Sequence, residues 1–369
     1  MKKVFLLVLI MISAFSIPKV DACTGITLQT TDSMKVTART IEWAAQPLTA
    51  MYVVVPRGQK QCSMLPDGTM RGKTFKATYG YVGIAVENDE FVMEGINEAG
   101  LAAGLFYFPE YGEYMPYKEA DKSLCVSDMQ FVAWVLSQCA TIDEMIALLP
   151  TIRVIGVDPR ASTVHWRVTE SSGRQVVVEI VNQDVKVYEN PLGVLTNSPE
   201  LTWHLTNLNN YVNLMAGSVN HREVGSLNLQ AFGGGSGLHG LPGDMTPPSR
   251  FVRAAFFQST APVLETIEAT VVQAFHLLNN FDIPVGIQFS DPNLVPDMPS
   301  ATQITIATDL QNLRFYYRTM YNTAIRCIDL RKIDFDRVEF QVKALDISRA
   351  NPSIFTRNGS TPFRIRNKI

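Results

Sequence analysis

The stretch Val20-Asp21-Ala22-Cys23-Thr24-Gly25-Ile26-Thr27-Leu28 joins an export signal to the first strand of the folded chain. Two lysines at positions 2 and 3 precede an apolar run over residues 4–15, and Ile17-Pro18 ends that run shortly before a small residue, as expected ahead of a cleavage site. The run is too short to span a bilayer. The sequence therefore predicts a signal peptide over residues 1–22, a mature chain that begins at Cys23, and export to the bacterial periplasm or medium.

A cysteine at the start of a mature chain carries a thiol and an α-amine on one residue. The amine has a pKa of about 7.7–8.0 and the thiol a pKa of about 8.5, so the amine can accept the thiol proton near neutral pH. Cys23 can therefore act as a nucleophile without a histidine, as N-terminal threonine does. A lipoprotein anchor, which also begins at a cysteine after a signal peptide, is the alternative. Asp21 fits the lipoprotein cleavage motif poorly, because small or apolar residues are expected there. The first 23 residues alone nevertheless favour neither a catalytic cysteine nor a lipid anchor.

Bulk composition excludes some classes of partner. Removal of residues 1–22 leaves 369 − 22 = 347 residues and changes the formal charge from 32 − 35 = −3 to 29 − 34 = −5. Such a chain lacks the basic stripe that nucleic-acid binding requires. We expect one domain over residues 23–369, because no repeat or linker divides the chain. The spacing of the five cysteines indicates neither a metal site nor a disulfide framework, which leaves open the disulfide state of Cys62, Cys125, Cys139 and Cys327.

Hydrophobic periodicity predicts the secondary structure. Strands are predicted at residues 26–28, 35–43, 51–55 and 79–86, twice within 91–108, over much of 162–196, and in a hairpin around 309–312. Helices are predicted at residues 127–139, after a capping box at 141–144, and at 199–215, 248–259 and 262–280. Antiparallel strand blocks between helical blocks favour the α+β class, and the apolar run at 176–181 favours sheets buried on both faces. We therefore expect two stacked antiparallel sheets with helices outside each.

Other catalytic signals in the chain are weak. The glycines of Gly235-Ser236-Gly237-Leu238-His239-Gly240 match a dinucleotide-binding pattern, but no βαβ unit surrounds them, and a tightly turned loop is the better interpretation. None of the five histidines lies at a metal-ligand spacing from another, so we expect structural roles for them and no metal site. A serine-hydrolase elbow is absent, and nothing selects two carboxylates as a glycosidase pair.

The first predicted hairpin places a carboxylate near Cys23. If Asp32-Ser33 is a two-residue loop, position 23 lies opposite position 42, and Glu42 faces the Cys23 amine. Arg39 then points to the other face of the sheet, unless a bulge near Thr40 redirects it. A solvated surface pair is the alternative for both charged residues.

Five blocks of sequence, in this order along the chain, resemble the choloylglycine hydrolase family, which includes bile salt hydrolases and penicillin V acylases of the N-terminal nucleophile superfamily. The blocks are Cys23-Thr24-Gly25-Ile26, Ala38-Arg39-Thr40-Ile41-Glu42-Trp43, Glu94-Gly95-Ile96-Asn97-Glu98-Ala99-Gly100-Leu101, Gly193-Val194-Leu195-Thr196-Asn197-Ser198-Pro199 and Gly243-Asp244-Met245-Thr246-Pro247-Pro248-Ser249-Arg250-Phe251. The resemblance implies a four-layer αββα fold and cofactor-free hydrolysis of linear amide bonds. It makes the lipoprotein interpretation a minor one.

The resemblance also implies roles for individual residues. Cys23 is the nucleophile and, through its amine, the acid and base. Arg39 matches an arginine beside the thiol, where a cation favours thiolate. Asn197 matches an asparagine that binds the oxyanion, and Arg250 matches a second arginine near the nucleophile.

Two positions depart from many bile salt hydrolases. Glu42 stands where those enzymes have aspartate, which keeps the carboxylate but alters its reach. Tyr107 stands where they have an oxyanion-hole asparagine, so the hole is intact only if the backbone N–H supplies the contact, and a tyrosine here resembles the penicillin acylases. Trp43 is a candidate wall of the acyl pocket, with core packing as the equal alternative.

The expected function is deconjugation of glycine- or taurine-conjugated bile acids through a thioester intermediate. Penicillin V is the second candidate substrate, since both present an apolar acyl group and a polar leaving portion. A homotetramer without stable membrane insertion is expected from the resemblance. A non-enzymatic, lipid-anchored envelope protein is the alternative from another functional class.

Overall fold

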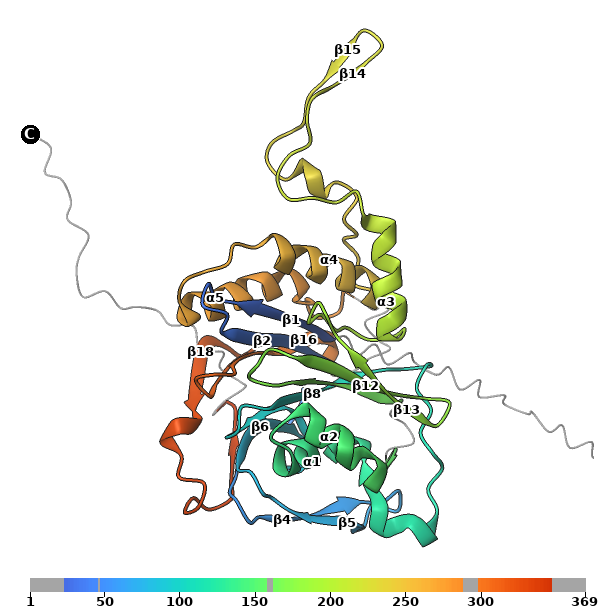
Figure 1. Cartoon of the computed structure of the whole chain (residues 1–369), viewed down its shortest axis with the longest axis vertical. Coiled ribbons are helices and arrows are strands. Elements are labelled where there is room, and N and C mark those ends of the chain that lie inside the picture. The colour runs from blue at the N-terminus through green and yellow to red at the C-terminus, as the bar shows by residue number, and fades with distance from the viewer. Residues whose placement is uncertain (1–22, 46, 158–161, 288–297, 347–369) are drawn as a thin grey trace, which may run out of the picture.

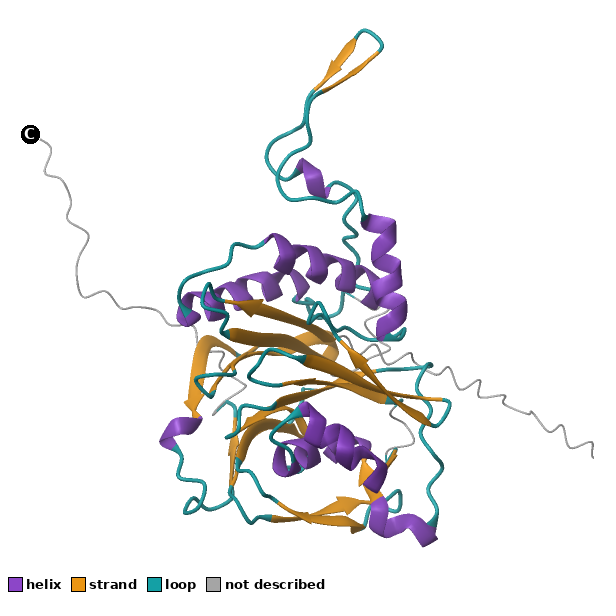
Figure 2. Ribbon diagram, viewed as in Figure 1, coloured by secondary structure: helices purple, strands orange, loops and turns teal. Residues whose placement is uncertain are grey.

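The fold consists of two large β-sheets with helices on both outer sides (Figures 1 and 2). The computed structural model describes residues 23–346 apart from residues 46, 158–161 and 288–297, so the predicted signal peptide lies outside the described residues. A hydrophobic core fills the space between the sheets, with Ile41 and Ile304 of one sheet in the same cluster as Ile84 and Ile96 of the other. The predicted α+β class with two stacked antiparallel sheets is confirmed.

The smaller sheet has five antiparallel strands and begins with the predicted nucleophile. Its order is β1 (Cys23–Gln29), β2 (Lys35–Ala45), β16 (Met298–Asp309), β17 (Arg314–Thr319) and β18 (Asn322–Asp329). The hairpin predicted near residues 309–312 joins β16 to β17 and is confirmed.

The larger sheet has eight strands, also paired antiparallel. Its order is β13 (Asp184–Glu189), β12 (Gln175–Val181), β11 (Val164–Thr169), β8 (Ala102–Tyr107), β7 (Val92–Asn97), β6 (Tyr81–Val86), β3 (Ala50–Val55) and β19 (Gln341–Ala344). Strand β12 is buried along almost its whole length, as its apolar run predicts.

Helices cover the outer face of each sheet and complete the αββα arrangement. Helices α4 (Pro247–Thr260) and α5 (Ile267–Leu278) pack on the five-stranded sheet. Helix α1 (Phe131–Gln138) packs on β7 and β8 of the larger sheet, and α2 (Ile142–Leu148) follows it. Half of the predicted capping box is present, since the Thr141 hydroxyl accepts from the Glu144 N–H at 3.1 Å, whereas the Glu144 carboxylate accepts from the Ala140 N–H at 2.7 Å rather than from Thr141.

Two predicted helices are shorter than expected. Helix α3 (Leu201–Asn207) continues only as a 3₁₀ turn to Tyr211, because asparagines in this stretch bond to their own helix end; Asn209 Nδ2 donates to Thr206 O at 2.8 Å. Helix α5 begins five residues after position 262, because Thr266 caps its first turn by accepting from the Ala269 N–H.

Smaller strand pairs lie outside the two sheets, and none was expected from sequence. They are β4 (Lys60–Met64) with β5 (Met70–Lys76), β9 (Cys125–Ser127) with β10 (Arg153–Ile155), and β14 (Arg222–Val224) with β15 (Leu227–Leu229). The last pair is the tip of a long excursion, residues 212–243, which projects from the body between α3 and α4 and which we name the arm (Figure 1). The Gly235–Gly240 motif lies in the arm as a turned loop, as expected.

The predicted register of the first hairpin is wrong by one residue. Cys23 pairs with Ile41 rather than with Glu42, and Gly25 pairs with Arg39. The cause is a three-residue loop: the Thr30 N–H donates to Met34 O at 3.0 Å, and Ser33 between them has φ of 68°. A loop of this type ends in a left-handed residue and shifts every pair by one position relative to a two-residue turn. Arg39 therefore shares the face of Cys23 without any bulge.

Within the described residues, no helix has the length and apolar character needed to cross a bilayer.

Candidate active site

Cys23 is the first residue of β1 and is buried at 3% exposure. Its backbone nitrogen donates to Asn197 Oδ1 at 2.9 Å, although the two residues are 174 positions apart in the chain. Strand β1 is held beside the Asn197 segment by paired backbone bonds, Gly25 N to Leu195 O at 2.7 Å and Leu195 N to Gly25 O at 3.2 Å. The fold thus brings the predicted nucleophile and the predicted oxyanion ligand into direct contact.

The Asn197 side chain connects three predicted site residues. Its Oδ1 accepts from Cys23 N and, at 2.7 Å, from Arg250 Nη2. Its Nδ2 donates to the backbone oxygen of Tyr107 at 2.7 Å, at the end of β8. These bonds fix the orientation of the amide, with its nitrogen toward Tyr107 and its oxygen toward the amine position.

Arg250 lies in the first turn of α4 and is buried at 1% exposure. Its Nη1 donates to Cys23 O at 2.5 Å and to Thr24 Oγ1 at 2.8 Å. Burial lowers the pKa of Arg250 to about 10, with Glu42 acting in the opposite direction, so the side chain is charged at neutral pH. One guanidinium therefore fixes both the main chain of Cys23 and the side chain of Asn197.

The turn before α4 positions Arg250. Asp244 accepts from the Thr246 N–H at 2.9 Å and from the Ser249 hydroxyl at 2.6 Å, which orders the chain into the helix. Pro247 is the first helical residue, a position where the missing N–H costs nothing.

Arg39 lies between the sheets on the Cys23 side of β2, and no part of it is exposed. Its Nη1 donates to Leu105 O and lies 3.4 Å from Glu94 Oε2, while its guanidinium carbon is 3.8 Å from the centroid of the Phe106 ring. Glu94 also pairs with Arg167 at 3.6 Å. Burial raises the pKa of Glu94, and the two arginines oppose that rise.

Two glycines make room for this buried Arg39–Glu94–Arg167 triad. A Cβ on Gly104 would stand 1.7 Å from Glu94 Oε2, and a Cβ on Gly25 would stand 2.6 Å from Arg167 Nη1. Any larger residue at either position requires the charged groups to move, so both glycines are needed for close approach of charged side chains.

Glu42 is buried on the other face of β2, and its Oε1 accepts from the Thr302 hydroxyl at 2.7 Å. Burial raises its pKa to about 7, against the opposing effect of Arg250 and Arg39. Its Oε2 has no hydrogen-bond partner within the part of the chain that the structure describes. Because Cys23 pairs with Ile41, position 42 lies level with the bond that precedes Cys23.

Several neighbours of the site were not singled out from sequence. Glu94 and Arg167 hold Arg39, while His165 and His204 lie behind Asn197 with both rings fully buried. The only available signal was polar residues inside apolar strands. Trp43 packs against the larger hydrophobic cluster, which supports its core interpretation.

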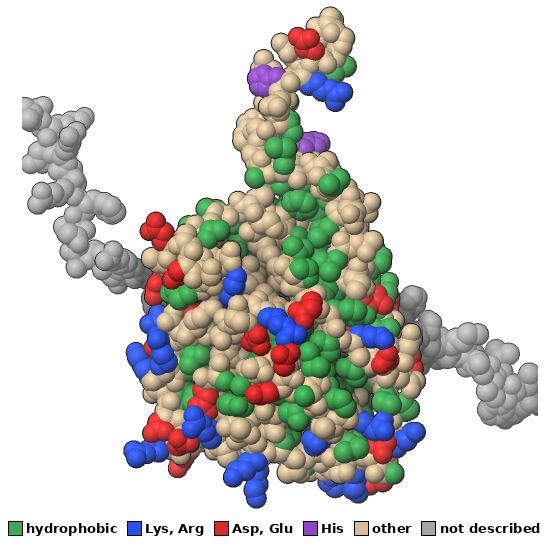
Figure 3. Space-filling view, viewed as in Figure 1, with side chains coloured by type: hydrophobic (Ala, Val, Ile, Leu, Met, Phe, Trp, Pro, Cys, Tyr) green, Lys and Arg blue, Asp and Glu red, His purple; other side chains and the backbone are tan. Residues whose placement is uncertain are grey.

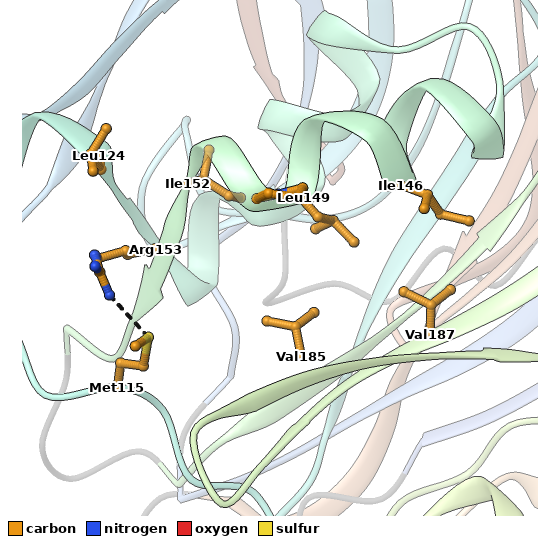
Figure 4. A pocket seen from close by; sticks show the side chains of 9 residues that line it. Met115, Leu124, Ile146, Leu149, Ile152, Arg153, Val185 and Val187 are labelled. Atoms are coloured by element: carbon orange, nitrogen blue, oxygen red, sulfur yellow. Dashed lines mark hydrogen bonds between the residues drawn. The ribbon is translucent and has the colours of Figure 1, made fainter.

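The described residues contain no group of three or more His, Cys, Asp or Glu side chains that could hold a metal ion. A groove of about 430 Å³ opens elsewhere, between α2 and the edge strand β13, and is lined by Met115, Ile146, Val185 and their neighbours (Figure 4). None of the predicted site residues lines it.

Comparison with known proteins identifies the family. Residues 23–343 match the model of the linear amide C–N hydrolases, choloylglycine hydrolase family, and the match begins at Cys23.

The chain belongs to the choloylglycine hydrolase family.

Relatives within the choloylglycine hydrolase family agree with this assignment. The chain is 29% identical over 339 residues to a bile salt hydrolase/transferase of Clostridium perfringens, covering 89% of this chain and 100% of the relative. It is 25% identical over 355 residues to a penicillin V acylase of Pectobacterium atrosepticum, covering 89% and 86%.

Solved structures give the same fold. A conjugated bile acid hydrolase variant from C. perfringens superposes with a TM-score of 0.79 at 29% identity, covering 91% of this chain and 100% of that one. A penicillin V acylase from Agrobacterium tumefaciens superposes with a TM-score of 0.71 at 23% identity, covering 90% and 94%, and shows the fold alone. As a member of the choloylglycine hydrolase family, the protein is a linear amide C–N hydrolase that acts on small molecules.

Proposed function

We propose that the protein is exported, that removal of residues 1–22 frees the amine of Cys23, and that the mature enzyme hydrolyses conjugated bile salts through a thioester. The observation that carries this proposal is the set of bonds around Cys23: its nitrogen on Asn197 Oδ1 at 2.9 Å and its carbonyl on Arg250 Nη1 at 2.5 Å. A free amine in that position is oriented by the asparagine, and the adjacent sulfur shares its residue.

Each chemical step uses groups already at the site. The Cys23 amine accepts the thiol proton, and the sulfur attacks the substrate carbonyl carbon. The carbonyl oxygen becomes an oxyanion that receives N–H groups from Asn197 Nδ2 and the Tyr107 backbone. The C–N bond then breaks, and the ammonium returns its proton to the leaving amine. Water, deprotonated by the same amine, attacks the thioester and releases the acid and the thiol.

Two charged residues support the free amine and the thiolate in this scheme. Glu42 Oε2 is a buried acceptor without a described partner, level with the bond that cleavage breaks, and the new amine supplies it with a donor. Arg39 is a buried cation on the face of Cys23 and favours the thiolate.

Conjugated bile acids are the preferred substrates because the relatives named as bile salt or conjugated bile acid hydrolases align over most of this chain. Penicillin V is the second candidate, and Tyr107 favours it, since a tyrosine at this point resembles the penicillin acylases. The match to a penicillin V acylase, which covers 89% of this chain, supports the same alternative.

The arm supports the homotetramer that we also propose. Seven apolar residues stand exposed along it: Val212, Met215, Val219, Val224, Leu227, Leu229 and Phe232. Four of them, Val212, Met215, Leu227 and Phe232, are exposed over more than half of their area. Phe232 is 98% exposed. Figure 3 shows apolar side chains gathered along the arm's base and the adjoining body. A monomer that leaves such a surface in water gains stability by burying it against other copies.

Two measurements test the proposed function. Intact-mass analysis of the purified, active enzyme should give a polypeptide that begins at Cys23 with no lipid, whereas one extra residue or an acyl chain on the amine contradicts the mechanism. A panel of glycine- and taurine-conjugated bile acids beside penicillin V should show the highest kcat/KM for a bile acid. Preference for the lactam reassigns the substrate and keeps the chemistry.

A further inference from the structure

Two buried histidines contact consecutive carbonyl groups of the segment that carries Asn197. His165 Nε2 lies 3.2 Å from Thr196 O, and His204 Nε2 lies 2.9 Å from Asn197 O. Both rings are fully buried, and they come from different elements, β11 and α3. A carbonyl oxygen only accepts, so each Nε2 carries a proton and donates it.

A carboxylate completes the arrangement behind His165. Its Nδ1 lies 3.1 Å from Glu179 Oε1, on the neighbouring strand β12, and the same oxygen accepts from the Leu201 N–H at 3.0 Å. His165 thus contacts the Thr196 carbonyl through one ring nitrogen and Glu179 through the other. Through Leu201, Glu179 also fixes the start of α3, the helix that carries His204.

Both rings stack on residues that follow site residues directly in sequence. His165 lies parallel to Phe108 at 4.5 Å between centroids, and Phe108 follows Tyr107. His204 lies parallel to Phe251 at 4.6 Å, and Phe251 follows Arg250. The two histidines are therefore packed against all three segments that supply Tyr107, Asn197 and Arg250.

We propose that His165, Glu179 and His204 are positioning residues, which hold the backbone at Thr196 and Asn197 so that the Asn197 amide reaches both Cys23 and the oxyanion. This inference rests on the proposed role of Asn197. None of the three is a catalytic residue, because all are buried behind the loop and act through it. A misplacement of about 1 Å at a reacting group can cost about 10²-fold in rate, so small movements of this backbone matter.

The test removes one donor and keeps its ring. His204→Phe retains the stacking on Phe251 but cannot donate to Asn197 O, and we expect kcat to fall about 10- to 10²-fold with KM changed little. His204→Gln places an amide N–H near the former Nε2 and should recover part of that loss. Val132→Ala, in the core around α1, is the control for lost stability and should keep the parent kcat.

A second pair of variants tests the carboxylate. His165 Nδ1 and the Leu201 N–H both face Glu179 Oε1, so a glutamine can donate to the one or accept from the other but not both. Glu179→Gln should therefore lose part of the kcat that Glu179→Ala loses, and Glu179→Ala should lose about tenfold or more.

A double-mutant cycle separates this inference from the proposed function. If His204 acts through Asn197, His204→Phe should cost little in an Asn197→Ala background, whereas independent roles give additive losses. Additive losses, or parent kcat in His204→Phe together with a stability loss like that of Val132→Ala, overturn the inference. Parent kcat in Asn197→Ala instead overturns the proposed role of Asn197.

Discussion

Gly104→Ala is the most direct test of the buried triad between the sheets. The new Cβ would stand 1.7 Å from Glu94 Oε2, whereas contacts under 3.0 Å are essentially never seen, so the carboxylate must retreat by at least 3.0 − 1.7 = 1.3 Å. Glu94 Oε2 already lies 3.4 Å from Arg39 Nη1, and Glu94 Oε1 lies 3.6 Å from Arg167 Nη2. Both ion pairs are therefore close to the longest distance at which they still count as ion pairs, and a further shift away from either arginine would break one.

The size of the effect follows from how the triad responds. If Glu94 and its neighbours shift together, overpacking costs about 1–3 kcal/mol. If the shift separates Glu94 from an arginine, an uncompensated buried charge costs about 3–5 kcal/mol. We therefore expect the free energy of unfolding to fall by at least about 2 kcal/mol, and the rate of amide hydrolysis to fall because Arg39 loses its fixed partner.

Urea unfolding and steady-state hydrolysis measure both effects. Gly234→Ala, a glycine on the arm with no atom within 4 Å of the added carbon, is the matched control and should behave as the parent. Adding Glu94→Asp to Gly104→Ala shortens the acid by one methylene and should restore part of the stability. A loss below about 0.5 kcal/mol for Gly104→Ala, typical of an unstrained surface change, would refute the placement of Glu94.

The remaining predictions concern the proposed nucleophile, the proposed oxyanion ligand, a buried histidine and the arm. Cys23→Ala should abolish turnover and Cys23→Ser should leave little, since an alcohol is a poor partner for a weak amine; retained activity in either assay contradicts the mechanism. Asn197→Ala should lower kcat about 10²- to 10³-fold in steady-state kinetics at unchanged fold, as judged by circular dichroism. Burial lowers the pKa of His204 to about 4 from 6.5, so the unfolded chain binds a proton that the folded chain excludes between those values. The contribution of neutral His204 to the free energy of unfolding should be full above pH 6.5 and fall by up to about 3 kcal/mol as the pH approaches 4. Urea unfolding at pH 7 and pH 5 should show this loss of stability in the parent and not in His204→Phe. Leu227→Asp with Phe232→Asp should convert the proposed tetramer to smaller species in size-exclusion chromatography with light scattering, and an unchanged mass rules out the arm as the interface.

Sequence patterns predicted the elements of the fold better than the contacts between them. Alternation located most strands of both sheets, because each strand's own residues determine which face is buried. The first hairpin failed at its loop: nothing in Thr31-Asp32-Ser33 excludes a two-residue turn, and one extra loop residue moved Arg39 to the face of Cys23. The predicted helix at 199–215 is longer than α3, because the apolar periodicity continues past Asn207, whereas local side-chain hydrogen bonds end the helix there.

The candidate site was predictable only in part. The five family-like blocks pointed to Cys23, Asn197 and Arg250, which the structure connects by direct hydrogen bonds. Contacts such as Glu94 with Arg167, or His165 with Thr196, join residues far apart in sequence, and no local pattern records them. Residues that support the site residues from behind are therefore brought together by tertiary packing alone.

The order of synthesis gives the bond between Cys23 and Arg250 a further meaning. Cys23 is among the first residues of the folded chain to leave the ribosome, yet the guanidinium that holds its carbonyl is made 227 residues later, and strand β16 beside β2 later still. A nascent or truncated chain therefore carries the sulfur without its holder. The contacts that hold Cys23 are therefore complete only after the chain has been synthesised through β16.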